Sequence, residues 1–388
     1  MTDASRESAS AVGTRGSVPG ARRGVPGTRR GAFGALPPAP HVRIGSSSAG
    51  DVWLVSACLL PAAGWGVFLF GIPALLVIAV SVVAALAAEA VTSPLLRRFT
   101  LHDGSAFLTG LIIGLSMPAG VPLYVPAAAS AFAIVVVKQS FGGLGCNWMN
   151  PARGGVVFAL LSWGDSMTRW LPARGTESAL PPFVAWRAAL DAHTGAGGPL
   201  AVLSAAGYSF SPLDDAVVGW VNAHLLAPLG AALHPGSFDL LVGHASGLIG
   251  ALSVPLLLLG ALILLKRRFA RWQVPVAYVA SFAVLTFLLG GPVTGQRWLA
   301  GGLVFHLLGG GLVLGAFYVA IDPVTSPLTG RGRWIYGVVL GVLTFVTRFF
   351  GSLGDGVAVA ILLGNCAVPL IDRVSQRRVV NAGRGKTI

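Results

Sequence analysis

The sequence predicts an all-α polytopic membrane protein with about ten transmembrane helices, because its hydrophobic residues fall in blocks of about 20, the length that crosses a bilayer as a helix. Of the 388 residues, 54% are hydrophobic and only 11% are charged, and the mean hydropathy is +0.76. Soluble chains carry a charge on about 25% of their residues. This composition excludes a soluble single domain. It also excludes a disordered chain, which would be polar and rich in charge.

Residues 1–40 form a tail rich in Gly, Ala, Arg, Ser and Pro, with no hydrophobic run before Val52. A signal peptide needs such a run near the N-terminus, so we expect no cleaved leader. The composition instead predicts a disordered cytoplasmic tail.

The hydrophobic blocks that come after this tail predict two membrane halves. Two of the blocks, 104–118 and 154–164, are short for a membrane span. Membrane proteins tend to build sites at mid-depth where a segment is short and interrupted by Gly or Pro. The expected parts are a first half over 41–164, an outward-facing loop region over 165–245, a second half over 246–373 and a cytoplasmic tail over 374–388. The blocks themselves are 53–71, 73–92, 104–118, 121–139, 154–164, 246–265, 273–290, 303–321, 333–350 and 356–372.

Lysine and arginine predict the orientation of the spans, because cytoplasmic loops carry an excess of both. If the N-terminus is cytoplasmic, the loops and span ends on that side hold the larger set. We therefore expect both termini in the cytoplasm, and we attribute the net charge of +13 to orientation rather than to nucleic acid. The cytoplasmic set is Arg97, Arg98, Lys138, Lys266, Arg267, Arg268, Arg271, Arg331, Arg333, Arg373, Arg377 and Arg378; the opposite set is Arg169, Arg174, Arg187, Arg297 and Arg348.

The sequence lacks the motifs of self-sufficient enzymes. Cys58, Cys146 and Cys366 lie far apart, which argues against a disulfide framework or a zinc site, and we expect no metal site. There is no GxxxxGK[ST] or GxGxxG loop, and no run of cysteines for an iron–sulfur cluster. These absences favour one component of a larger assembly, without a complete active site of its own.

A stretch rich in Gly and Asn, 138–152, joins two spans. Its glycines permit positive φ angles and close backbone approach. Asn147 and Asn150 can satisfy backbone groups left open where a helix breaks in the membrane. The stretch fits a tight re-entrant turn, and it fits the lining of a cofactor site or ion path equally well.

A second polar stretch, 322–333, comes after the eighth block. Asp322 lies near Arg331 and Arg333 in the sequence, which indicates either a charge pair at the membrane interface or a solvated anchor. An ionisable residue near the membrane is by default a candidate functional residue. The residues that we expect could line a path are Asn147, Asn150, Asp322, Thr325, Asp355 and Asn365.

Other polar groups have simpler interpretations. The carboxylates Glu89, Asp103 and Asp372 lie at span ends, as Asp355 does, and none stands clearly at mid-bilayer. Asn365 and His306 are more internal, and hydrogen bonding between helices is their better explanation. The peptide VTSPL occurs at 91–95 and again at 324–328, but the two copies lie after spans that an inverted duplication would not exchange.

Four motifs resemble one known family. They are KQSFGGLGCNWMNPA (138–152), MTRW (167–170), DPVTSPLTGRGR (322–333) and FGSLGDGVAVAILLGNCAVPLIDR (350–373). They resemble the D subunit of Rnf-type electron transport complexes and, more distantly, the B subunit of the sodium-translocating NADH–quinone reductase. The resemblance covers about residues 39–373, and it identifies the chain as a divergent member of the family.

The resemblance implies ten helices in two inverted halves of five, as in urea and ammonium channels. It implies a bacterial inner-membrane component that passes electrons through flavin, FMN or riboflavin, while its complex moves sodium ions or protons. The implied partners are the other membrane and peripheral subunits of that complex and the lipid bilayer. In the family, one FMN is attached through its phosphate to a threonine in the outward loop.

The matching stretch here departs from the family's pattern. It keeps Asp191, Thr194, Gly195 and Ala196, but Gly197-Gly198 stands where the family has the acceptor threonine. Glycine has no hydroxyl to form a phosphoester, so we predict that covalent FMN is absent from this loop. Ser211, further downstream, is a weak alternative acceptor. At the start of the sixth span, a carboxylate typical of the family is also missing from 250–253.

These departures leave more than one function open. The leading hypothesis is a membrane subunit of a redox-driven ion pump. The alternative is a channel-like or transporter scaffold derived from the same family that has lost its covalent flavin and its electron transfer. A purely structural assembly subunit is a third hypothesis.

Overall fold

The computed structural model describes residues 48–95, 101–143, 145–175, 180–191, 199–205, 207–229, 232–267, 271–295, 298–299, 301–351 and 353–384. The predicted N-terminal tail, 1–40, lies outside them. All of the described residues belong to the compact unit Ser46–Ile388. They form helices and loops, with one isolated antiparallel bridge between Pro118 and Leu248.

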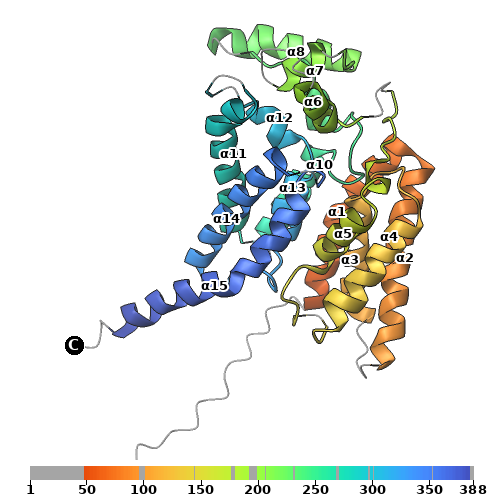
Figure 1. The fold of residues 1–388 in the computed structure, drawn as a ribbon, viewed down its shortest axis with the longest axis vertical. Coiled ribbons are helices and arrows are strands. Elements are labelled where there is room, and N and C mark those ends of the chain that lie inside the picture. The colour runs from red at the N-terminus through yellow and green to blue at the C-terminus, as the bar shows by residue number, and fades with distance from the viewer. Residues whose placement is uncertain are drawn as a thin grey trace, which may run out of the picture. The chain divides into compact units, whose positions relative to one another are not determined.

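The first set of helices covers the predicted first half (red to yellow in Figure 1). α2 packs against α3 and α4, α4 packs against α5, and α4 runs without interruption into the π-helix η2. The elements are α1 (Ser48–Phe70), α2 (Ile72–Leu95), η1 (Leu101–Asp103), α3 (Ser105–Leu115), α4 (Tyr124–Phe132), η2 (Ala133–Gln139) and α5 (Pro151–Ser162).

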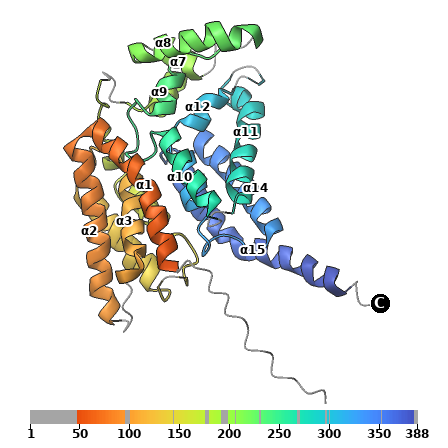
Figure 2. The ribbon, with the colours of Figure 1, turned by 180° about the vertical axis from the view of Figure 1, so that it is seen from behind.

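The second set covers the predicted second half, and α1 packs against α10 to join the two sets (Figure 2). Within it, α14 packs along α11 because glycines face that helix: a Cβ on Gly337 would lie 2.5 Å from the Cβ of Ala277. The elements are α10 (Val254–Lys266), α11 (Gln273–Val293), α12 (Leu303–Leu308), α13 (Leu312–Leu314), the π-helix η6 (Gly315–Val319), α14 (Gly330–Phe349) and α15 (Val357–Arg384).

The region between the two sets is not a simple loop. Its short helices gather at one end of the bundle (green in Figures 1 and 2). They are η3 (Ser166–Thr168), α6 (Pro182–Asp191), α7 (Pro199–Ala205), α8 (Pro212–Val221), η4 (Asn222–Leu226), η5 (Ala227–Leu229) and α9 (Ser237–Val242).

The prediction of an all-helical membrane protein is confirmed at this level. Among the described residues, four helices are long and apolar enough to cross a membrane: Ala49–Phe70, Ile72–Pro94, Gln273–Val293 and Val357–Gln376. Four apolar helices are shorter: Ser105–Leu115, Tyr124–Gln139, Pro151–Ser162 and Val254–Lys266. The number of ten spans stays a prediction.

Two predicted blocks are not continuous helices. The block 303–321 ends its first helix at Leu308, and Gly309–Gly311 separate α12 from α13. Gly310 has a φ of 75°, and a Cβ there would lie 3.0 Å from Nη2 of Arg348, so only glycine fits. In the block 246–265 the helix begins only at Val254.

The non-helical segment before α10 meets the end of α3. The amide of Ile249 donates to the carbonyl of Met117 at 3.1 Å, and the amide of Gly250 donates to the carbonyl of Leu115 at 2.8 Å. Backbone groups that leave a helix inside a membrane must find partners within the protein. Here each broken segment satisfies the other, and the pair forms one side of a cavity.

Candidate functional site

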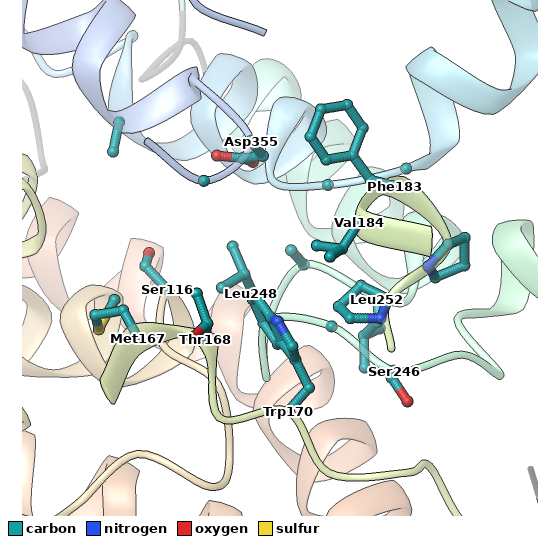
Figure 3. Close-up of a pocket in the computed structure, with 18 of the residues that line it drawn as sticks. Ser116, Met167, Thr168, Trp170, Phe183, Val184, Ser246, Leu248, Leu252 and Asp355 are labelled. Atoms are coloured by element: carbon teal, nitrogen blue, oxygen red, sulfur yellow. The ribbon is translucent and has the colours of Figure 1, made fainter. Parts of the chain in front are cut away.

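A cavity of about 610 Å³ lies where both helix sets meet the connecting region. Its walls come from the end of α3, from α5, from residues 164–170, from α6 and from the segments around Leu248 and Asp355. Figure 3 shows Asp355 and Phe183 on one side, with Met167, Thr168 and Trp170 on the other. Most of the lining is apolar, and a few polar groups interrupt it.

Arg153 on α5 is the buried cation of this lining. Asn150 caps α5 by accepting the amide of Arg153 at 3.2 Å, which fixes where the first turn begins. The Arg153 Nη1 donates to the Ser116 hydroxyl at 3.2 Å. Its Nε and Nη2 atoms are buried and have no hydrogen-bond partner among the described residues. An unpaired guanidinium is costly inside a protein, so this one is suited to a ligand that brings acceptor atoms.

Asp355 faces the cavity from the turn before α15. One oxygen accepts the amide of Val357 at 3.2 Å, and the other accepts the amide of Gly311 in the break between α12 and α13. The carboxylate therefore ties the broken helix to the start of α15. Asp355 was one of the expected path residues, and the structure places it in the cavity wall.

Arg348 lies behind Asp355 and is completely enclosed. Its Nε donates to the backbone carbonyl of Asp355 at 3.0 Å, and its Nη1 donates to the carbonyl of His306 at 2.6 Å. The guanidinium also lies 5.0 Å from the ring centroid of Phe282, a cation–π distance. Arg348 lies one residue before the end of α14, and its side chain is only 1% exposed, so it is not a solvated flanking charge. Its assignment to the outward side stays a prediction.

A second polar cluster joins the two polar stretches of the sequence. The Asn150 amide nitrogen donates to the Asp322 carboxylate at 3.2 Å, and the Thr325 hydroxyl donates to it at 3.3 Å. Burial raises the pKa of the Asp322 carboxyl, although the hydrogen bonds from Val324, Asn150 and Thr325 oppose that rise. Arg333 donates to the carbonyls of Pro327 and Leu328 rather than to Asp322.

The six expected path residues therefore occupy four places. Asn150, Asp322 and Thr325 form one cluster, and Asp355 lies in the cavity wall. Asn365 accepts the hydroxyl of Tyr336 at 2.7 Å inside the second helix set. Asn147 is buried, and its side-chain oxygen has no partner among the described residues.

The flavin-loop motif is only partly within the described residues. Asp191 is the last residue of α6, and Thr194, Gly195, Ala196, Gly197 and Gly198 lie outside the described ranges. α6 itself lines the cavity through Phe183, Val184, Arg187 and Ala188, so the motif comes directly after a helix of the cavity wall.

Ser211 is already engaged elsewhere. Its hydroxyl donates to Asp239 at 2.6 Å and accepts the amide of Asp214 at 3.2 Å as the N-cap of α8. Its side chain is buried by these contacts.

Sequence reasoning missed Arg153 and the environment of Lys138. Arg153 adjoins an apolar block, and that position was the available signal. Lys138 was counted among the charges at the cytoplasmic loops and span ends, and it lies in η2 with its side chain buried against Glu89 at 2.6 Å and Ser105 at 2.5 Å. The sequence around Lys138 does not predict its contact with Glu89, which is 49 residues away.

Comparison with known proteins identifies related chains. The sequence matches the family described as NQR2, RnfD, RnfE over residues 36–381. It is 38% identical over 343 residues to the D subunit of the proton-translocating ferredoxin:NAD(+) oxidoreductase complex of Clostridium ljungdahlii, covering 87% of this chain and 93% of that protein. The D subunit of the Na(+)-translocating ferredoxin:NAD(+) oxidoreductase complex of Acetobacterium woodii is 31% identical, with coverage of 88% and 93%. The D subunit of the ion-translocating oxidoreductase complex of Stutzerimonas stutzeri is 38% identical, with coverage of 86% and 92%.

Proposed function

Because this chain belongs to the NQR2, RnfD, RnfE family, we propose that it is the D subunit of an Rnf-type, ion-translocating electron transport complex. The observation that carries the proposal is the match over residues 36–381, which spans both helix sets and every wall of the cavity. The chain then works in the bacterial inner membrane, with both termini cytoplasmic and with the other subunits of the complex as partners. The Lys/Arg asymmetry supports that orientation.

The order of the elements supports two inverted halves of five spans. α2 packs against α4 and α4 against α5; in the second set α11 packs against α14 and α14 against α15. The connections α4–α5 and α14–α15 both carry the pattern F-G-x-L-G, at 141–145 and 350–354. A half with five spans ends on the side of the membrane opposite to the one where it began. A second half of five spans therefore starts from that other side, and its topology is inverted relative to the first.

The cavity fits a flavin that is held without a covalent bond. Its volume lies within the range of roughly 300–1,000 Å³ that cofactor sites occupy. Trp170 and Phe183 offer apolar contact for a flat ring system, and the unpaired nitrogens of Arg153 would donate to a carbonyl oxygen or a phosphate. A bound flavin would accept and pass on electrons. Arg153 and Asp355 would orient it, and the apolar walls would exclude water.

The flavin content of the purified protein tests this proposal. The native protein should show the visible absorbance of bound flavin, and the flavin should be released on denaturation. The loss of the acceptor threonine favours one alternative, a channel-like scaffold without electron transfer. That alternative predicts a colourless protein whose reconstituted vesicles conduct ions passively, and such a result would replace the proposed function.

A further inference from the structure

An apolar face runs along α11 and α14 at the outer edge of the second helix set, away from the first set (Figures 1 and 2). A Cβ on Gly337 of α14 would lie 2.7 Å from the carbonyl oxygen of Val274, at the start of α11. Gly341, one turn later, lies against Ser281, so the two helices run in the same direction. On each helix the exposed side chains recur every three or four residues, which places them on one face. They are Ile335, Val338, Val342 and Val346 on α14, and Trp272, Val276, Ala280 and Val284 on α11.

Two tryptophans meet at the end of this face where both helices begin. The ring centroids of Trp272 and Trp334 lie 5.5 Å apart, with the ring planes at 89°. Both side chains remain open to their surroundings, with exposed fractions of 54% and 42%. Tryptophan is enriched where the membrane meets water, because its ring is apolar and its N–H group is polar. The pair therefore marks the level of the lipid headgroups on this face.

The apolar part of the face is long enough for one leaflet. From Trp334 to Val346 it extends about 18 Å along α14 at 1.5 Å per residue. The hydrocarbon core of a bilayer is about 30 Å thick, so the face passes its middle. A lipid with its headgroup beside the tryptophans would meet apolar side chains along the whole length of its acyl chains.

Two arginines with exposed side chains stand beside the tryptophan pair. Arg271 directly precedes Trp272, and Arg331 lies three residues before Trp334, a spacing that makes them neighbours on the helix surface. Neither arginine forms an ion pair within the described part of the chain. The Asp372 carboxylate of α15, near the start of α14, already accepts a backbone amide at 3.1 Å. The headgroup end of the face therefore carries positive charge that the described residues do not neutralise.

We propose that this face binds an anionic phospholipid, with Arg271 and Arg331 holding its phosphate and the exposed side chains of α11 and α14 contacting its acyl chains. A guanidinium matches the oxygens of a phosphate in geometry and charge. A single lipid molecule accounts for both parts of the face, because it carries the negative charge and the apolar chains together. In the proposed orientation both helices begin on the cytoplasmic side, where the leaflet is negatively charged. The proposal does not depend on bound flavin or on electron transfer.

The test measures contact between Trp334 and lipids of different charge. The full-length protein, alone and in its complex, is placed in phosphatidylcholine vesicles that contain a small fraction of phosphatidylglycerol with brominated acyl chains. Bromine quenches the fluorescence of a tryptophan that it contacts, and subtracting the signal of the Trp334→Phe variant isolates the quenching of Trp334. Brominated phosphatidylcholine at the same fraction gives the value for random mixing. We expect phosphatidylglycerol to quench Trp334 well above that value.

The arginines should account for this preference. Arg271→Gln and Arg331→Gln should each lower it about fivefold, the effect of one basic residue near an anionic membrane surface, and the combined variant should abolish it. The matched control is Arg169→Gln combined with Arg174→Gln, which removes the same charge from exposed residues of the connecting region. The control should keep the preference of the parent.

Three results would overturn the inference. These are equal quenching by both lipids in the parent, equal loss of preference in the control, or a Trp334 that no lipid quenches in the complex, which would assign the face to a partner subunit. If the combined variant does not assemble, the single variants decide, and Trp272→Phe gives a second position for the subtraction if Trp334→Phe fails. A protein that keeps the lipid preference but binds no flavin would count against the proposed function alone.

Discussion

Lys138 and Glu89 form an ion pair that is closed off from solvent, with Nζ of Lys138 2.6 Å from Oε1 of Glu89. The two side chains are 1% and 0% exposed, and the Ser105 hydroxyl and the Gln139 amide complete the cluster. Removing one partner of such a pair leaves a buried charge uncompensated, whereas removing both charges need not be costly. The pair therefore joins α2 to η2 in a way that a double substitution can test.

We expect Lys138→Met alone to lower the stability of the protein by about 3–5 kcal/mol, because the buried Glu89 carboxylate then loses the ammonium group that lies 2.6 Å from it. The combined Glu89→Gln and Lys138→Met variant should recover most of that loss. Thermal unfolding of the detergent-purified protein measures both. If the double variant is as unstable as the single one, the pair contributes packing rather than charge compensation.

Asn150→Leu should disturb the protein more than Asn147→Leu. Asn150 caps α5 and donates to Asp322, and loss of an N-cap alone costs about 1 kcal/mol. Membrane-inserted yield and complementation of complex activity measure the two variants side by side. Asp322→Asn is a third variant for this comparison, because it keeps the shape of the Asn150–Asp322 cluster and removes its charge. Normal function in all three would make the Gly- and Asn-rich stretch merely connective.

Arg153→Met should weaken flavin retention about tenfold to 100-fold, because a hydrogen bond to a charged group is worth about 1.5–3 kcal/mol. Arg174→Met is the control: Arg174 lies over the ring of Phe68 at 5.6 Å and does not line the cavity. Flavin-to-protein ratios after extended washing compare them. Equal ratios in both variants would remove Arg153 from the site.

Much of the fold could be predicted from hydrophobic blocks, because block length reports directly on a span. The block 73–92 corresponds to α2, and 273–290 corresponds to α11. The block 303–321 was predicted as one helix because Gly309–Gly311 bring no charged or polar side chain that would interrupt a hydrophobic block. Atoms of Arg348 and Asp355 lie where a Cβ at Gly310 would be placed, and the sequence around the glycines does not show that contact.

Site residues could be predicted less well, because contacts between distant segments decide them. Asn150 and Asp322 were singled out separately, yet their hydrogen bond joins residues 172 apart. From the sequence, Arg348 was interpreted as one of the charges that set the orientation of the spans. In the structure its guanidinium donates to the carbonyls of His306 and Asp355 inside the protein. A charged residue reports topology only when it lies outside the folded interior, and local sequence does not reveal that.

Labelling of single cysteines should show the C-terminal end of α15 on the cytoplasmic side and the connecting region on the outside. Gln376→Cys and Asp215→Cys are suitable sites because both positions are exposed, whereas Ser375 is buried against Thr329. The background needs Cys146→Ser and Cys366→Ser, since both native thiols are exposed. An impermeant reagent should label position 215 and not 376 in whole cells. The reverse pattern would invert the topology.

The glycine pair at 197–198 decides a final prediction, that the native loop carries no covalent FMN. A phosphoester needs a hydroxyl oxygen, and Gly197-Gly198 supplies only backbone where the family has threonine. Ser211 is a poor substitute, because its hydroxyl is buried and bonded to Asp239 at 2.6 Å. Thr194 is the remaining hydroxyl of the motif.

Peptide mass spectrometry over residues 188–215 should find no FMN adduct in the native chain. Replacing Gly197-Gly198 with a single Thr restores the family's spacing, and co-expression with a flavin transferase should then attach FMN to that Thr. Thr194→Val in the restored chain is the control, and it should leave attachment intact. An adduct on Thr194 or Ser211 of the native protein would contradict the prediction. It would also mean that the loop had moved its acceptor rather than lost it, because the remainder of the motif still presents a hydroxyl to the transferase.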